Sequence, residues 1–511
     1  MQTSTYSGLT KGTLKICETQ EISIVSVSPK VLLIGLDAAD CDYIEANLAR
    51  LPNIAGFLGG RGLHRLNLEP LSGAVWSSFN TGLKPAAHGV YHHMQWDPVT
   101  MRIRRTHPDW IGGAEPFWRD LARSGAQVAA FDVPFAFRGD TGGALEIANW
   151  GSHDLVEDFW TSDAATRRKV TAVARRHPMG FEVPVPKSVT HLNTILADIL
   201  RGIDVKTEMM LGLLEQASWD MFLVVFGELH RGGHIFWPRP EGEPTSIPHG
   251  ARDAIYERMD TALGRVFHAV GDTTDIVLFA LHGMEVNHSQ SHLSQAMLLH
   301  GLGTAPDARQ RAPDREDFGL IRELRRHVPP SLQHWIADRV PQSVRDFVLA
   351  RELVGGLDWT TTRAFSLQGD VSGYWRFNLS GREARGVVPG EDYDALCEAL
   401  AQAAKGFVGA DGAALVSDIV FPARDWAGAR AQLLPDVVIN WNTALSQSGV
   451  ARHPDLEAVR AAPTTGRSGN HRFTGFFAHR GPRPLQGAVP SHISEIGAFA
   501  KRLLDQSGPA G

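Results

Sequence analysis

The sequence predicts an α/β protein with a doubly wound, mostly parallel sheet and helices on both faces. Short continuous apolar runs recur along the 511 residues, as is typical of strands buried on both faces of a parallel sheet. Amphipathic stretches at 196–217 and 252–270 lie between several of these runs. Alternation of strand and helix favours this fold class over an all-helical or all-strand one.

Six apolar runs are the predicted strands, at 31–36, 128–133, 221–226, 276–281, 437–441 and 475–478. Ligands of doubly wound sheets bind beyond the carboxyl ends of the strands, so polar residues there are candidate site residues. Asp37 follows the first run, Glu228 and His230 follow the third, and His282 follows the fourth. We expect these side chains to meet at one edge of the sheet.

Two insertions interrupt the alternation. The segment 138–195 is rich in loops, and a basic helical stretch at 303–357 is predicted as a cap over the sheet edge, with a purely structural subdomain as the alternative. The predicted organisation is a lead-in at 1–29, a core of 30–302 and 358–505, the helical cap at 303–357 and a tail at 506–511.

Composition argues against several kinds of partner. The formal net charge is −6 and no basic run stands out, so no nucleic-acid surface is expected. No apolar stretch approaches the roughly 20 residues of a membrane-spanning helix, and the first residues lack the pattern of a secretory signal. The odd number and wide spacing of Cys17, Cys41 and Cys397 predict that they form no disulfide framework. These features predict a cytoplasmic protein and leave its oligomeric state open.

His230 and His234 stand four residues apart, which places both imidazoles on one face if the stretch is helical. Many two-histidine metal sites have this spacing, but a chain with 22 histidines also produces it by chance. Spacing alone is therefore a weak indication of a metal site. Glu228, just upstream, is a candidate ligand or a carboxylate that orients one.

The segment 71–89 reads LSGAVWSSFNTGLKPAAHG. It resembles the nucleophile region of the type I phosphodiesterase and nucleotide pyrophosphatase branch of the alkaline phosphatase superfamily. In that branch a Thr or Ser opens a helix, a Thr-Gly pair follows nine residues later, and Pro-x-x-His-Gly closes the segment. Here Ser72 has the nucleophile position, Thr81 and Gly82 form the pair, and 85–89 is the closing motif.

Further motifs follow in the family's order. Asp37 stands at the position of its first metal-binding aspartate, and 224–237 resembles the segment that supplies the next two ligands. The sequence around His282, Ala-Leu-His-Gly, resembles the family's Ser-Asp-His-Gly, and Gly-Asn-His-Arg around His471 resembles its last histidine motif. Residues 373–386 also resemble a segment of bacterial predicted phosphohydrolases. The resemblance, which covers about 30–485, implies the metal ligands Asp37, Ser72, His230, His234, His282 and His471.

This chain departs from the family pattern at two ligand positions, because His230 and Leu281 stand where the family usually has aspartates. The first implied site is then made of His230, His234 and His471, and the second of Asp37, Ser72 and His282. The family binds two ions, typically Zn²⁺, ~4 Å apart. A three-histidine site still suits Zn²⁺, with iron or manganese as alternatives, and we expect one or two ions per chain.

Other residues are candidates for supporting roles. Glu228, His288 and His292 could replace the missing ligands. His93 falls where nucleotide pyrophosphatases carry a phosphate-binding asparagine, so the resemblance implies that it contacts the substrate.

The resemblance implies a metal-dependent hydrolase of small phosphate esters, of the phosphodiesterase or pyrophosphatase type, in which Ser72 attacks phosphorus. Sulfate-ester and phosphonate hydrolysis are the nearest alternatives, although residues 72–76 lack the arginine of the sulfatase motif. Two further hypotheses remain: a degenerate member that binds a phosphorylated ligand without hydrolysing it, and a three-histidine centre used for different metal chemistry.

Overall fold

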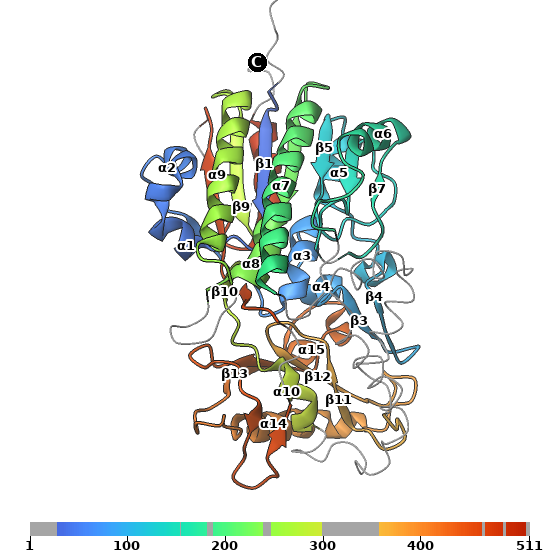
Figure 1. The fold of residues 1–511 in the computed structure, drawn as a ribbon. Coiled ribbons are helices and arrows are strands. Elements are labelled where there is room, and N and C mark those ends of the chain that lie inside the picture. The colour runs from blue at the N-terminus through green and yellow to red at the C-terminus, as the bar shows by residue number, and fades with distance from the viewer. Residues whose placement is uncertain are drawn as a thin grey trace, which may run out of the picture.

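The computed structural model describes residues 28–153, 155–180, 188–238, 247–298, 357–461, 466–483 and 487–506. A large α/β part lies above a smaller part built on an antiparallel sheet (Figure 1). The predicted lead-in up to residue 27, the cap from 303 to 356 and the tail from 507 lie outside the described residues.

An eight-stranded sheet with the order β2-β18-β9-β1-β8-β5-β6-β7 forms the centre of the large part. Its strands are β1 (Val31–Leu36), β2 (His64–Leu66), β5 (Val128–Phe131), β6 (Leu145–Ala148), β7 (Trp160–Thr161), β8 (Met221–Phe226), β9 (Asp275–Ala280) and β18 (Gly475–Arg480). The five strands from β9 to β6 are mutually parallel, whereas β18, β2 and β7 run antiparallel to their neighbours at the two edges. The predicted mostly parallel sheet is confirmed.

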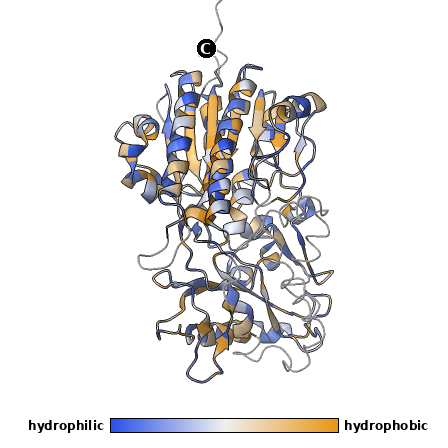
Figure 2. Ribbon diagram, viewed as in Figure 1, coloured by the Kyte–Doolittle hydropathy of each residue, from blue (hydrophilic) through white to orange (hydrophobic). Residues whose placement is uncertain are grey.

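Helices cover both faces of this sheet, as the sequence predicted. One face packs against α1 (Cys41–Ala46), α2 (Pro52–Leu58), α6 (Ala164–Val173), α7 (Val189–Leu214) and α9 (Ala251–Val270), and the other against α3 (Val75–Thr81), α5 (Phe117–Arg123) and α16 (Ile496–Asp505). Alternate residues of β1 enter the two apolar clusters, Leu32 and Ile34 on one side and Val31 and Leu33 on the other. Burial on both faces explains the continuous apolar strands in Figure 2.

The smaller part is a four-stranded antiparallel sheet with the order β11-β12-β14-β13. Its elements are β11 (Ala364–Leu367), β12 (Gly373–Phe377), β13 (Val416–Val420), β14 (Val437–Trp441), α10 (Ser291–Ala296), α14 (Tyr393–Lys405) and α15 (Pro422–Asp425). The assignment of 437–441 to the parallel sheet was wrong. β14 is an inner strand with Val437 in one apolar cluster and Val438 in another, so its sequence resembles a buried parallel strand.

Further short elements complete the two parts. They are the paired strands β3 (Met94–Asp97) and β4 (Arg102–Arg105), β10 (Gly283–Val286) and β17 (Gly469–Arg472), β15 (Val450–Ala451) and β16 (Val459–Arg460), together with α4 (Pro85–His88) and α8 (Glu228–Phe236). The loop-rich segment 138–195 contains β6, β7, α6 and the start of α7. Within the described ranges, none of the helices combines the length and apolarity needed to cross a bilayer.

Candidate active site

The carboxyl ends of β1, β8 and β9 meet at the edge of the large sheet that faces the smaller part (Figure 1). Asp37 directly follows β1, His282 follows β9 by two residues, and α8 after β8 carries His230 and His234. His471 arrives from β17, which pairs with β10 just after His282. The structure thus brings these five predicted residues together, all of them buried.

Gly469 allows β17 to touch α8. A Cβ atom on Gly469 would lie 2.2 Å from the carbonyl oxygen of Gly233, so a larger residue there would push the two elements apart. The backbone contact is fixed by Ser468 N–H, which donates to the carbonyl of His234 at 2.8 Å. This close packing sets His234 beside His471.

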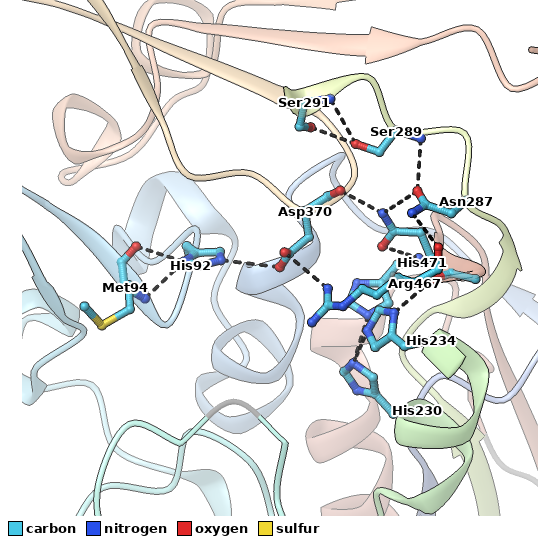
Figure 3. A network of polar contacts seen from close by, with 12 residues as sticks. His92, Met94, His230, His234, Asn287, Ser289, Ser291, Asp370, Arg467 and His471 are labelled. Carbon is cyan, nitrogen blue, oxygen red and sulfur yellow. Dashed lines mark hydrogen bonds and ion pairs between the residues drawn. The ribbon is translucent and has the colours of Figure 1, made fainter. Parts of the chain in front are cut away.

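The imidazoles of His230, His234 and His471, called here the three-histidine cluster, meet at His230. His230 Nε2 lies 3.0 Å from His234 Nε2 and 2.9 Å from His471 Nε2 (Figure 3). Two nitrogens that share a tetrahedral Zn²⁺ at about 2.1 Å lie about 3.4 Å apart. Ligand atoms of His230, His282 and His471 lie within 4.8 Å of one another, as do those of His153, His230 and His234, and the donor set of each group fits a divalent metal.

The other ring nitrogens of two of these histidines are held in place. His230 Nδ1 lies 2.7 Å from Asp37 Oδ2, and His234 Nδ1 lies 3.0 Å from the carbonyl oxygen of Gly469. A proton on each Nδ1 satisfies these acceptors and leaves the Nε2 lone pair available. Second partners of this kind orient metal-binding imidazoles in proteins.

Burial controls the charge of the cluster. It holds the pKa of His234 well below the ordinary value, assisted by the charge of Arg467 and the neighbouring histidines. Burial likewise holds the pKa of His471 well below its usual range, assisted by His282 and His230. Both imidazoles are therefore neutral near pH 7, the form that binds metal ions.

Ser72 opens the 3₁₀ turn Ser72–Ala74, which runs directly into α3. A Cβ on Gly73 would lie 2.5 Å from the carbonyl oxygen of Tyr91, so glycine lets this turn pack closely on the chain beside it. One turn further on, the indole N–H of Trp76 donates to Asp37 Oδ1 at 3.1 Å and ties α3 to the end of β1. Ser72 therefore lies on the element that touches Asp37.

The immediate neighbour of Ser72 comes from the smaller part of the molecule. Tyr374 on β12 lies beside Ser72; burial raises the pKa of its phenol, and Ser72 offsets this only partly. Ser72 is 5% exposed. Its described contacts are with Tyr374 and not with the histidines, so the structure brings Ser72 near the cluster without placing it inside.

Three residues that sequence reasoning missed also lie at this site. The ring centroid of His153, on the loop after β6, is 4.4 Å from that of His230, and His153, His230 and His234 have ligand atoms within 4.8 Å of one another. Arg467 Nη1 lies 3.4 Å from Asp370 Oδ1, and Figure 3 shows this pair next to the cluster. His153 comes shortly after the end of the parallel strand β6, so recognising β6 in the sequence would have indicated His153 as a candidate.

The predicted supporting residues have different surroundings. His93 stacks on His92, with ring centroids 4.3 Å apart, and His92 Nε2 reaches Asp370 Oδ2 at 3.4 Å. His93 therefore lies next to the network of Figure 3. His288 and His292 face the carbonyl oxygens of Leu445 and Ser448. Those two contacts point to roles in loop packing.

Glu228 is fully buried at the start of α8, where it faces a set of charged groups. Its Oε1 lies 3.1 Å from His177 Nε2 and 3.7 Å from Lys206 Nζ, and Lys206 Nζ also contacts Asp132 Oδ2 at 2.7 Å. Burial opposes ionisation, but Lys206 and His177 outweigh it and lower the pKa of Glu228 to about 2. Glu228 thus anchors the helix that carries His230 and His234.

The site is thus a set of buried histidines at the strand ends of a mostly parallel α/β sheet. Residues 31–432 match the family described as type I phosphodiesterase / nucleotide pyrophosphatase. The chain belongs to this family of phosphoester hydrolases.

Solved structures with a similar fold include phosphonoacetate hydrolase from Sinorhizobium meliloti 1021 in complex with phosphonoformate, at 13% identity and TM-score 0.49 over 93% of this chain and 96% of that one. Murine ectonucleotide pyrophosphatase / phosphodiesterase 5 follows at 11% identity and TM-score 0.46, covering 93% and 95%. The human protein of the same name has 12% identity and TM-score 0.44 over the same shares. No curated protein matches the chain.

Proposed function

We propose that this chain hydrolyses small phosphate esters of the phosphodiester or pyrophosphate type, with a divalent metal ion in the three-histidine cluster and Ser72 as the nucleophile. The observation that carries the proposal is the cluster of buried histidines around His230 at the sheet edge where Ser72 opens α3. Family membership adds the reaction class.

His230, His234 and His471 would hold the ion, Zn²⁺ in the first instance and iron or manganese as alternatives. A bound divalent cation stabilises negative charge on phosphoryl oxygens and favours ionisation of a nearby hydroxyl. The protein supplies what that chemistry requires: neutral imidazoles, orientation through Asp37, and a buried environment.

The reaction on Ser72 has two displacements. In the first, Ser72 Oγ forms a bond to phosphorus, the bond from phosphorus to the leaving oxygen breaks, and the serine proton ends on the released alcohol. In the second, water attacks phosphorus, the Ser72 ester bond breaks, and the serine recovers its proton. The sum consumes one water and gives an alcohol and a phosphomonoester.

Arg467 is the candidate residue for binding the substrate's negative charge. Its side chain is 17% exposed, and its charge lowers the pKa of both His234 and His471. A guanidinium binds phosphate oxygens through several parallel hydrogen bonds. Asp370 aligns this guanidinium from one side, and His93 is a second candidate for substrate contact.

Turnover of bis(4-nitrophenyl) phosphate by protein stripped of metal and reloaded with Zn²⁺, Mn²⁺ or Fe²⁺ tests the proposal. We expect Ser72→Ala to lower kcat by about 10³-fold or more. Ser77→Ala, which changes a neighbouring buried serine of α3, serves as the matched control. Full activity in Ser72→Ala would refute the nucleophile, and inertness of the native chain toward phosphodiesters, pyrophosphates, 4-nitrophenyl phosphate and its sulfate would favour a binding-only protein.

A cytoplasmic location belongs to the same proposal. Cys41 and Cys397 are buried thiols, and burial raises the pKa of both. Such thiols resist oxidation and suit a reducing compartment. Localisation of a tagged full chain by cell fractionation tests this.

A further inference from the structure

We propose that His153 is a further metal ligand, which binds the ion of the centre together with His230 and His234. The inference deepens the proposed function, on which it rests for the presence of a metal ion. His153 lies in the loop between β6 and β7, and none of the motifs that carry the family resemblance includes it.

His153 packs against both histidines of α8. Its ring centroid lies 4.4 Å from that of His230, at an interplanar angle of 89°, and 5.4 Å from that of His234. One ligand atom of each imidazole lies within 4.8 Å of the other two. Nitrogens that share a tetrahedral Zn²⁺ are about 3.4 Å apart, so these atoms need to approach by at most about 1.4 Å. His153 can therefore complete the three protein ligands that catalytic zinc usually has.

One buried carboxylate fixes the backbone that precedes His153. Asp132 directly follows β5 and accepts the backbone N–H groups of Trp150 and Gly151, both at 2.8 Å. It also accepts the hydroxyl of Ser152 at 3.2 Å. A Cβ atom on Gly151 would lie 2.8 Å from Asp132 Oδ2, so glycine permits this close approach. The loop is thereby held up to the residue before His153.

A side chain of α8 joins this loop to the helix that carries the other two ligands. Arg231 Nη2 donates to the carbonyl oxygen of Ser152 at 3.0 Å, and Arg231 Nη1 donates to the carbonyl oxygen of Gly180 at 2.9 Å. Arg231 follows His230 in sequence, and Ser152 precedes His153. The hydrogen bond between them therefore sets the two imidazoles against each other.

A buried cation makes a second connection between the loop and α8. Lys206 Nζ lies 2.7 Å from Asp132 Oδ2, which holds the loop, and 3.7 Å from Glu228 Oε1 at the start of α8. All three side chains are buried, and buried charges are costly unless they are paired. The pairing here fixes the loop and the helix relative to each other, as ligands from two separate elements require.

The remaining surroundings suit an added donor. His153 is partly exposed whereas His230 and His234 are buried, so an ion can enter the group from the side of His153. The position of Leu281, where the family has an aspartate, offers no donor atom. A nitrogen from His153 adds a donor to a centre that lacks one.

The alternative is that His153 only packs against His230 as an aromatic ring, and two substitutions separate packing from binding. His153→Phe keeps a ring without a donor nitrogen, whereas His153→Asp keeps a donor atom without the ring. The test is Co²⁺ binding by the full chain after removal of metal with a chelator, followed by the visible absorption of bound Co²⁺. His107→Ala is the control, because that side chain is 59% exposed.

We expect His153→Phe to weaken Co²⁺ binding by about 100-fold or more and to change the visible spectrum, because one nitrogen donor is lost. His153→Asp should bind Co²⁺ within about 10-fold of the native chain, because a carboxylate oxygen is also a ligand. His107→Ala should match the native chain in both respects. Thermal melting of each metal-free variant verifies folding, and His153→Gln replaces His153→Phe if that variant does not melt cooperatively.

Three results would overturn the inference. They are native affinity with an unchanged spectrum in His153→Phe, a larger loss in His153→Asp than in His153→Phe, which is the order that ring packing predicts, and absence of Co²⁺ binding by the native chain.

The two proposals fail separately. Native-like Co²⁺ binding in His153→Phe, together with Ser72-dependent turnover of bis(4-nitrophenyl) phosphate, would overturn only the assignment of His153. Co²⁺ binding that depends on His153, without turnover of any ester, would leave His153 standing as a ligand and overturn the hydrolase proposal.

Discussion

The two halves of the histidine centre contain similar residue types but differ in what those residues face. In one half, His230 Nε2 contacts His234 and His471, and ligand atoms of His282 lie within 4.8 Å of those of His230 and His471. In the other, Asp37 faces His230 and the indole of Trp76, and Leu281 packs in the core. The difference teaches that ligand-type residues make a metal site only where their lone pairs converge, and that one carboxylate can serve its neighbour instead of an ion.

The largest expected effect is the difference in kcat/KM between a variant of one half and a variant of the other. His234→Ala removes a nitrogen from the three-histidine cluster and should lower kcat/KM for bis(4-nitrophenyl) phosphate by about 10³-fold or more. Asp37→Asn, in the other half, should lower it by about 10- to 100-fold, since it removes only the partner that orients His230. Steady-state kinetics at saturating Zn²⁺ measures both. Equal losses in the two variants would erase the distinction between the halves.

The next prediction concerns the buried ion pairs at the start of α8, the helix that carries His230 and His234. Lys206→Met leaves the buried carboxylates of Asp132 and Glu228 without their cation, at the start of the helix that carries His230. Removing one partner of a buried ion pair costs about 3–5 kcal/mol of unfolding free energy. Urea unfolding should show this loss, with Lys169→Met as the exposed control. A loss under about 1 kcal/mol would mean that the network does not hold α8.

The next prediction concerns Arg467, the candidate residue for binding the substrate's negative charge. If this guanidinium binds a phosphoryl oxygen, KM should rise about 10- to 100-fold, with Arg467→Lys in between, because Lys keeps the charge and loses the paired hydrogen bonds. Metal content should stay the same, since Arg467 is not a ligand. An unchanged KM, or a loss of metal in Arg467→Ala, would contradict this role.

The smallest effect is a dependence of stability on pH. Burial lowers the pKa of His88 to about 4 and holds those of His234 and His471 below their ordinary value, so the folded state keeps these imidazoles neutral. The unfolded chain takes up protons near pH 6.5, so this stabilisation is present above that pH and decreases as pH falls toward the folded pKa values. Each histidine should contribute a slope of about 1.4 kcal/mol per pH unit in that window.

Urea unfolding of the metal-free protein at pH 7.5, 6.5 and 5.5 measures this slope. The metal-loaded protein should show a steeper decline, because protons must also displace the ion from the three-histidine cluster. Equal stability at all three pH values would show that the histidines are not neutral in the folded state.

Much of this site could be predicted from the sequence because its residues follow strands that are continuous and apolar. Asp37, His230 and His282 each come within a few residues of such a strand, and parallel strands end at the same edge. His153 follows β6, which is short and contains Glu146, so the strand gave no comparable pattern. Arg467 comes from a loop beside β17, and its approach depends on tertiary packing that no local pattern encodes.

The sheet assignment of β14 was wrong, and the surroundings of Glu228 could not be deduced, for related reasons. Glu228 lies next to His230 in sequence, but its buried partners, His177 and Lys206, are distant in sequence, so its direction could not be deduced. β14 is as apolar as a parallel strand because two different clusters cover its faces. In both cases the local sequence indicates whether residues are buried, but it does not indicate which neighbours bury them.

The most direct test of the account is to trap the reaction on Ser72. Metal-loaded protein mixed with bis(4-nitrophenyl) phosphate, quenched in acid and digested should yield a peptide from 71–89 heavier by one 4-nitrophenyl phosphoryl group on Ser72. Ser72→Ala should yield no such peptide, and its turnover of the substrate should be slower by about 10³-fold or more. Undiminished turnover in Ser72→Ala, or the adduct on a different residue, would contradict the account.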